Sequence, residues 1–317
     1  MNRRMWGIIA FVAAMAAVPF CLNPYQVDVF NNIGLYALLA LSLNIILGDA
    51  GMYNMGHAAF YAVGAYTAAF LNTQLGIGIL WTLPISGILA GLVGLVLARP
   101  VIHLRGDYLL IVTVGVGEIV RIALINNVFG VTGGPNGIFG IARPVFFGFK
   151  IAKPHEFFFL IWGFVALTVL LFSSLKNSRF GRALDYLRED HVAAEGSGID
   201  TARYQLLAFM LGAAWAGMAG CLYASKMSII SPESFNFWES VVIFIIVILG
   251  GSGNIAGVIL GAFLIVGLPE LFREFKAFSQ ARMWFFGLAM MIMMVFRTEG
   301  ILPPRPRVFK DIDRNVS

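Results

Sequence analysis

Long apolar runs, separated by short polar interruptions, dominate the sequence. Runs of about 17–25 apolar residues are long enough to cross the hydrocarbon core of a membrane as helices. We predict ten such segments: 5–21, 27–47, 55–72, 79–98, 107–126, 156–175, 203–225, 239–250, 255–269 and 281–297. The eighth is too short to cross alone, so we expect a half-helix there or a continuation into its neighbour. The pattern predicts an all-α, polytopic membrane protein with eight to ten transmembrane helices in a single domain, 1–317.

One hydrophilic segment, residues 176–203, interrupts this pattern with five Lys or Arg and five Asp or Glu residues. Within it, less polar side chains recur at steps of three and four, which places them on one face of a short amphipathic helix. These residues are Phe180, Ala183, Leu184, Leu187, His191 and Ala194. Gly196 and Gly198 predict the end of the helix. We expect this helix to lie in water at the membrane surface.

Composition agrees with a membrane protein. The chain is 59% hydrophobic and 12% charged, whereas soluble domains carry about 25% charged residues. Its net charge of +5 is explained by Lys and Arg retained beside membrane spans, and does not indicate a nucleic-acid partner. Cys21 and Cys221 form neither a disulfide framework nor a metal-binding spacing.

The first apolar segment has two interpretations. Residues 1–20 combine Arg3 and Arg4 with an apolar core and the small-residue sequence Ala14-Met15-Ala16, as a signal peptide does. A retained first helix has the same pattern, and we favour it because many further spans follow.

Lys and Arg are distributed unequally between alternate connections. With the N-terminus inside, the cytoplasmic segments are 1–4, 99–106, 176–203 and 297–317, and they hold 2, 2, 5 and 5 of these residues, or 14. The outside segments 127–155, 226–238 and 270–282 hold 3, 1 and 3, or 7. This ratio predicts that both termini are cytoplasmic. The largest outside loop, 127–155, contains the turn-forming run TGGPNG and is a candidate gate or docking segment.

Glycines interrupt two apolar runs in a similar way. The sequence ILGDAG at 46–51 resembles ILGGSG at 248–253. Paired glycine interruptions indicate broken or re-entrant helices around a translocation path, although glycine-rich apolar sequence also produces such similarity by chance. The candidate hinge residues are Gly48, Gly51, Gly56, Gly250, Gly251 and Gly253.

Polar residues inside predicted spans are candidates for lining that path. Placing a charged side chain in lipid is energetically costly, so such a residue usually pairs with another group or lines a functional path. Glu118 and Arg121 lie three apart on one helix. They form either a self-neutralising structural pair or a charged lining for a zwitterionic solute. Asn44, Asn54, His57 and Tyr66 either line the path or form hydrogen bonds between helices.

The sequence contains no evident enzyme site. Its four histidines share no metal-binding spacing. A phosphate-binding G-x-x-x-x-G-K-[ST] sequence and a G-x-S-x-G sequence are both absent. We therefore predict a non-catalytic membrane protein that does not itself bind ATP through a P-loop.

Several of these segments together resemble one family. In order, they are GDAGMYNMGHAAFYAVGAYTAAFL, RGDYLLIVTVGVGEIVRI, TGGPNGI, GRALDYLREDHVAAEGSGID and SPESFNFWESVVIFIIVILGGSGNIAGVILGAFL. The chain resembles the permeases of branched-chain amino-acid ABC importers, most closely their M-type subunit, from about residue 32 to residue 303. Several long motifs in one order are more specific than any single motif.

The resemblance implies that residues 176–203 couple the permease to an ATPase. Ala193, Ala194 and Gly198 match the family's E-A-A-x-x-x-G loop, whereas Val192 stands at the acidic position. The remaining candidate contacts, including substitutes for the missing acid, are Arg182, Leu187, Arg188, Glu189 and Asp190.

The resemblance also implies a set of partners in a bacterial inner membrane. They are a paired related permease, two ATPase subunits that bind ATP and Mg²⁺, and a periplasmic solute-binding protein. The implied substrates are leucine, isoleucine or valine, with urea or short amides as the alternative. A secondary transporter driven by an ion gradient and a structural membrane scaffold remain competing classes.

Overall fold

The computed structural model describes residues 22–104, 106–128, 130–146, 148–272 and 300–303, together with the single residues 19 and 291. The predicted spans 5–21 and 281–297 lie almost wholly outside the described residues. The other eight predicted spans all correspond to helices, and most of their boundaries agree within a few residues.

The described chain is helical apart from its connections. Its helices are α2 (Pro24–Asn44), α3 (His57–Leu75), α4 (Ile79–Ala98), α5 (Asp107–Ile125), α6 (Pro154–Lys176), α7 (Arg179–Glu189), α8 (His191–Gly196), α9 (Thr201–Met227), α10 (Phe237–Gly250), α11 (Ile255–Ala262) and α12 (Leu268–Phe272). A π-helical turn extends α2 over Ile45–Asp49, and another, Phe263–Gly267, joins α11 to α12. Short 3₁₀ turns occur at Gly134–Asn136 and Pro232–Phe235.

Six segments of the described chain are long and apolar enough to cross a membrane: Pro24–Asp49, Ile79–Ala98, Asp107–Ile125, Pro154–Lys176, Thr201–Met227 and Pro232–Gly250. The last one includes the 3₁₀ turn before α10, which lengthens the span that the sequence predicts to be short. The helical, polytopic membrane fold predicted from the sequence is therefore confirmed.

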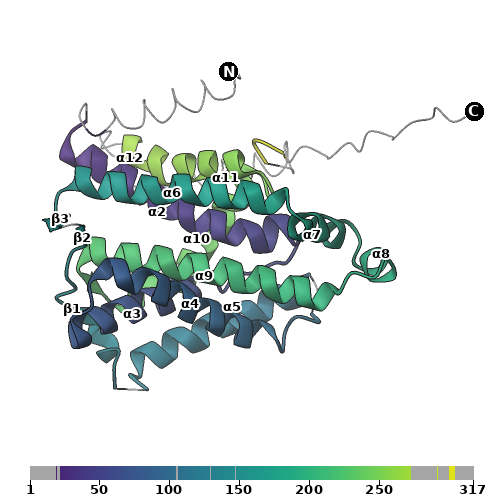
Figure 1. Ribbon diagram of the computed structural model, residues 1–317, viewed down its shortest axis with the longest axis horizontal. Coiled ribbons are helices and arrows are strands. Elements are labelled where there is room, and N and C mark those ends of the chain that lie inside the picture. Colours follow the sequence, from purple (N-terminus) through teal and green to yellow (C-terminus); the bar gives the residue numbers. More distant parts are fainter. Residues whose placement is uncertain are drawn as a thin grey trace, which may run out of the picture.

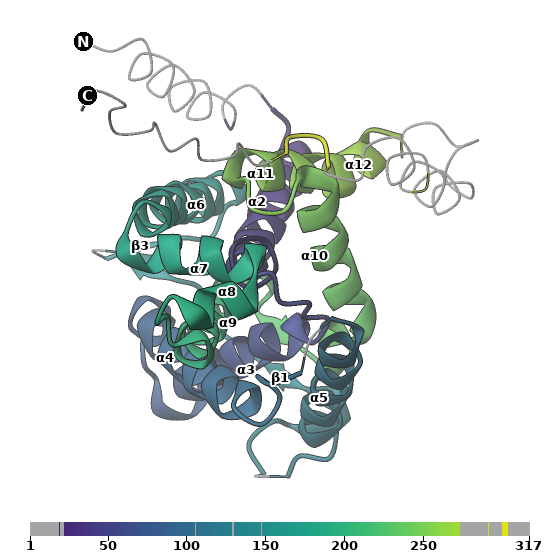
Figure 2. The ribbon, with the colours of Figure 1, turned by 90° about the vertical axis from the view of Figure 1, so that its right-hand side faces the viewer.

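Helices α2 and α9 form the centre of the bundle. Helix α9 packs against α3 and α4 on one side and against α2 on the other, and α2 also contacts α6, α10 and α11 (Figures 1 and 2). The peripheral helices α4, α5 and α6 expose large apolar side chains such as Trp81, Ile119 and Leu170. An outer surface of this kind suits lipid or another membrane helix, whereas a soluble protein would place polar residues there.

Small residues allow close contact between α3, α9 and α4. A Cβ built on Gly64 would lie 2.1 Å from the carbonyl oxygen of Gly217 on α9, and one built on Gly220 would lie 2.3 Å from the carbonyl oxygen of Tyr61. On α4, a Cβ at Gly94 would lie 2.4 Å from the Cβ of Ala213. Backbone contact through small side chains is a common way for membrane helices to associate.

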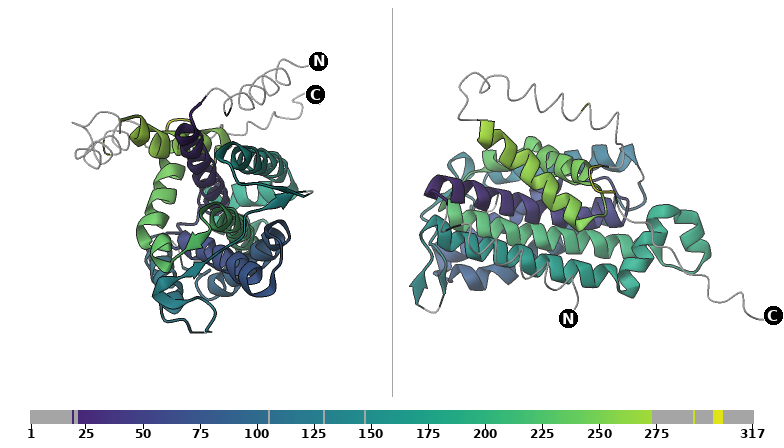
Figure 3. Two further views of the ribbon diagram at one scale, coloured as in Figure 1. Left: turned by 90° about the vertical axis from the view of Figure 1, so that its left-hand side faces the viewer. Right: turned by 90° about the horizontal axis from the view of Figure 1, so that it is seen from above.

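The hydrophilic segment 176–203 and the loop 127–155 lie at opposite ends of the bundle (Figures 1 and 3). One end carries α7 and α8. The other carries four two-residue strands: β1 (Ile138–Phe139) pairs antiparallel with β4 (Ile229–Ile230), and β2 (Val145–Phe146) pairs antiparallel with β3 (Phe149–Lys150). The loop that contains β1–β3 is tied to the end of α3 by a hydrogen bond of 2.7 Å from the Ala142 N–H to Asn72 Oδ1.

Candidate functional site

The first glycine-rich interruption separates α2 from α3. After the π-helical turn that ends at Asp49, the chain is not helical again until His57. Gly51 has a φ of +70°, a conformation that other residues rarely adopt. The Met55 N–H donates to Thr113 Oγ1 on α5 at 3.1 Å, and the Ala58 N–H donates to Ser240 Oγ on α10 at 2.9 Å. The non-helical segment 50–56 therefore leads into the space between α5 and α10.

The second interruption separates α10 from α11. Gly251 and Gly253 have φ values of +113° and +87°, so both depend on glycine. The side chain of Asn254 then caps α11 by accepting the N–H groups of Ala256 and Gly257. Both interruptions predicted from the glycine pattern are thus breaks between helices.

The two breaks contact each other. The Gly253 N–H donates to Asn44 Oδ1 at 2.8 Å, and a Cβ built on Gly48 would lie 2.4 Å from the Gly253 nitrogen. The segments that resemble each other in sequence, 46–51 and 248–253, therefore meet in space.

Two cationic side chains, one from α6 and one from α7, bond to residues of both breaks where they meet. Arg188 Nη1 donates to the Gly48 carbonyl oxygen at 2.6 Å, and Lys176 Nζ lies 2.9 Å from Asp49 Oδ1. Lys176 also donates to the carbonyl oxygen of Gly253. We call the group of Asn44, Gly48, Asp49, Lys176, Arg188 and Gly253 the break junction.

The four uncharged candidates for lining the path are buried within the chain. Asn44 belongs to the break junction. His57 Nε2 lies 2.7 Å from Ser42 Oγ, and Asn54 Oδ1 accepts the Gly56 N–H at 2.9 Å. The hydroxyl of Tyr66 has no hydrogen-bond partner among the described residues. In this conformation Asn44, Asn54 and His57 stabilise the first break and its surroundings, and their role in lining a path stays a prediction.

The charged candidates lie on α5 and are partly exposed. Arg121 Nε bonds Glu118 Oε2 at 2.8 Å, and Arg121 Nη1 lies 3.6 Å from Glu233 Oε1 in the 3₁₀ turn before α10. One guanidinium thus faces two carboxylates, which leaves a net negative charge in this group. Glu233 is not among the residues predicted from the sequence, because its contact with Arg121 joins residues far apart in the chain.

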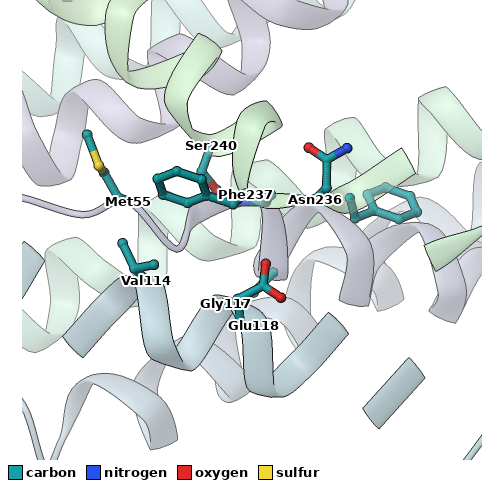
Figure 4. A pocket seen from close by; sticks show the side chains of 10 residues that line it. Met55, Val114, Gly117, Glu118, Asn236, Phe237 and Ser240 are labelled. Atoms are coloured by element: carbon teal, nitrogen blue, oxygen red, sulfur yellow. Dashed lines mark hydrogen bonds between the residues drawn. The ribbon is translucent and has the colours of Figure 1, made fainter. Parts of the chain in front are cut away.

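Glu118 also lines a small pocket where the first break, α5 and the start of α10 meet (Figure 4). Its lining includes Met55, Gly117, Asn236, Phe237 and Ser240. A second small pocket, on another side of the same segment, is lined by Asn54, Gly56 and Thr113, among others. The non-helical segment therefore borders both pockets, and one of them contains polar groups of both α5 and α10.

The hydrophilic segment 176–203 forms two helices. Ser178 caps α7 by accepting the N–H groups of Phe180 and Gly181. Asp190 ends α7 and caps α8, so the helix predicted as one is interrupted at this residue. Helix α8 ends at Gly196, as the sequence predicts.

The candidate coupling residues divide between two faces. The apolar face of α7 and α8, including Leu187 and Ala194, is buried against the chain itself, so it is not free to bind a partner. Arg188 is directed to Gly48. The exposed candidates are Arg182, Arg188, Glu189, Asp190, Ala193 and Gly198, and Tyr186 and Val192 are exposed beside them.

Comparison with known proteins gives a family match over most of the chain. A family profile described as "Branched-chain amino acid transport system / permease component" matches residues 25–296. The chain is 39% identical to the high-affinity branched-chain amino acid transport system permease protein LivM of Escherichia coli K12, over 95% of this chain and 76% of that protein. It is 27% identical to a probable LivM of Methanocaldococcus jannaschii, over 89% and 94% respectively. It is 28% identical to E. coli LivH, over 89% and 96%. None of the solved structures matches the chain significantly.

Proposed function

Since the chain belongs to the family of branched-chain amino acid transport permease components, we propose that it is a membrane-spanning subunit of an ATP-driven importer of leucine, isoleucine and valine. Its assembly contains a second, related permease, two ATPase subunits and a solute-binding protein. The ATPase subunits bind ATP and Mg²⁺. This chain supplies the path through the membrane and performs no catalysis.

The observation that carries this proposal is the position of α7 and α8. They form a capped helical unit at one end of the bundle, with an exposed face that includes Tyr186, Val192 and Ala193. A rigid helical unit outside the membrane is suited to fit a groove on another protein. Movement of the ATPase subunits then displaces this unit and rocks the bundle between inward-open and outward-open states.

The charge distribution supports a bacterial inner-membrane location with both termini and α7–α8 in the cytoplasm. The loop 127–155, at the opposite end of the bundle, then faces the periplasm, where a solute-binding protein delivers its ligand. The pocket beside Glu118 lies between these two ends. The Glu118 carboxylate and the nearby Arg121 guanidinium provide a negative and a positive charge, which complement the amino and carboxylate groups of a zwitterionic amino acid.

Uptake by proteoliposomes tests this proposal. The complete assembly, loaded with solute-binding protein and supplied with ATP, is expected to accumulate radiolabelled leucine, and excess isoleucine or valine to compete more strongly than urea or acetamide. The same vesicles without the ATPase subunits are the control. Uptake by this chain alone under an ion gradient would instead support a secondary transporter. Stronger competition by urea than by isoleucine or valine would show that the substrate is urea or a short amide.

Ala193→Arg is expected to reduce co-purification of the ATPase subunits by at least about tenfold, because a long charged side chain on the exposed face obstructs docking. Ala142→Arg provides a matched control, since Ala142 is also exposed but lies in the loop between β1 and β2. Figure 1 shows these strands at the opposite end of the bundle from α8. Quantitative immunoblotting of the purified complex measures the effect. Equal recovery of ATPase subunits with both variants would show that this face of α8 does not bind them.

A further inference from the structure

We propose that Lys176 and Arg188 are positioning residues that transmit movement of α7 to both helix breaks through the break junction. This inference rests on the proposed function and names the contacts through which an ATPase-driven displacement reaches the membrane interior. It assigns Arg188 a role inside the permease, in place of a contact with the ATPase.

Both cations lie within or directly beside α7 in the chain. Lys176 lies two residues before Ser178, the N-cap of α7, and Arg188 lies in the last turn of the same helix. Arg188 therefore belongs to α7, whereas Lys176 is the last residue of α6 and is separated from α7 by Asn177 and Ser178. Because α7 is a single rigid element, any rotation or translation of it moves Arg188 directly, and it acts on Lys176 through the short connection of Asn177 and Ser178.

The two cations bind backbone and side-chain oxygens of both helix breaks. At the end of a helix, backbone carbonyl oxygens lack helical donors and carry partial negative charge. Arg188 Nη1 donates to one such group, the Gly48 carbonyl oxygen, at 2.6 Å. Lys176 bonds Asp49 at 2.9 Å and also the carbonyl oxygen of Gly253, so a single ammonium group joins the first break to the second.

The two breaks are also joined directly to each other, without the cations. Asn44 Oδ1 accepts the Gly253 N–H at 2.8 Å, and Gly48 packs directly against that N–H. A displacement of either break therefore moves the other. Segment 50–56 leads from the junction to the pocket beside Glu118, and α10 leads from it to Ser240 in the same pocket. Two routes thus connect α7 to the polar pocket.

Removal of each cation tests the inference in the complete assembly. Lys176→Met and Arg188→Met are expected to lower leucine uptake per ATP hydrolysed by about tenfold, within the usual range of coupling between sites, while co-purification of the ATPase subunits and ATP hydrolysis stay within about twofold. Lys176→Arg and Arg188→Lys keep the charge and are expected to retain most of the coupling. Arg179→Met removes an exposed cation at the start of α7 and is the matched control.

The ratio of uptake to hydrolysis separates coupling from stability. A merely structural role would lower the amount of assembled complex and leave the ratio unchanged in the complex that remains. Unchanged ratios in both Met variants would therefore overturn the inference. If the wild-type assembly itself shows no ATP-dependent uptake, the proposed function fails instead, before any variant is compared.

A disulfide provides a second measurement that does not depend on the Met variants. A Cβ built on Gly51 lies 3.7 Å from the Cβ of Arg188, within the usual separation of about 3.5–4.5 Å for disulfides. We expect Gly51→Cys with Arg188→Cys, in a chain without Cys21 and Cys221, to be poorly coupled when reduced and to recover coupling when oxidised. The single variant Gly51→Cys controls for strain at its positive φ. Coupling that is unchanged or lower after oxidation would overturn the inference, since α7 would then have to move relative to the break.

Discussion

Gly64→Ala is expected to lower the melting temperature of the purified protein by about 10 °C. Any Cβ at this position would lie 2.1 Å from the carbonyl oxygen and 2.2 Å from the Cα of Gly217. Both atoms belong to the backbone of α9, so no side chain can rotate away to make room. The helices themselves must separate, and a well-packed interface resists such overpacking.

The expected decrease in melting temperature follows from the position of α9 in the fold. A shift of α9 away from α3 also disturbs its contacts with α4 and α2, because α9 packs against all three. Overpacking of this kind costs about 3 kcal/mol, which corresponds to roughly 6–12 °C at the 2–4 °C per kcal/mol typical of domains of about 150–250 residues. Thermal unfolding in detergent, followed by intrinsic fluorescence or by size-exclusion chromatography after heating, measures the effect.

Gly163→Ala is the matched control for Gly64→Ala. Gly163 lies within α6, and a Cβ built on it would meet no atom within 4 Å. Alanine there is expected to leave the melting temperature unchanged or to raise it slightly, since it favours the helical backbone. Equal melting temperatures for the two variants would contradict the close crossing of α3 and α9.

The sequence was sufficient to predict the spans and their breaks, because both depend on local pattern. Apolar runs of membrane length predict helices wherever they lie in the fold. Glycines at 48–51 and 250–253 predict breaks, because glycine adopts conformations that other residues avoid. The caps at Ser178 and Asp190 also depend only on neighbouring residues. The apolar spacing across Asp190 nevertheless predicts one continuous helix there, and that prediction is wrong.

Tertiary contacts could not be predicted in this way. The spacing of Leu187 and Ala194 correctly indicates one apolar face, but spacing cannot tell whether that face packs on the same chain or on a partner. Arg188 and Gly48 are separated by 140 residues, and no local pattern connects them. The pairing of β1 with β4 also escaped prediction, because two-residue strands have no periodicity to detect.

Gly48→Ala is expected to reduce ATP-dependent leucine uptake by at least about tenfold, because it separates the two helix breaks. A Cβ at residue 48 would lie 2.2 Å from Asn44 Oδ1 and 2.4 Å from the Gly253 nitrogen. These are the acceptor and the donor of the hydrogen bond that joins the breaks. The added methyl group therefore displaces both partners of that bond at once.

Loss of this bond has a thermodynamic and a functional consequence. Asn44 is buried, so an unsatisfied amide oxygen or N–H at this position costs about 1–3 kcal/mol. Displacement of Gly48 also moves its carbonyl oxygen away from Arg188, which donates to it at 2.6 Å. One methyl group thus disturbs both the contact between the breaks and the contact between the first break and α7. We expect a large loss of leucine uptake but only a small decrease in melting temperature, because the remaining packing of α2 is unaffected.

Asn44→Leu distinguishes the lost hydrogen bond from the added volume. Leucine removes the acceptor for the Gly253 N–H but leaves the Gly48 carbonyl oxygen and Arg188 in place. We therefore expect Asn44→Leu to lower the melting temperature about as much as Gly48→Ala, but to reduce uptake less. Gly115→Ala, on the exposed side of α5 with no atom within 4 Å of a built Cβ, is expected to change neither quantity. Normal uptake by the Gly48→Ala assembly would show that transport does not require close contact between the two breaks.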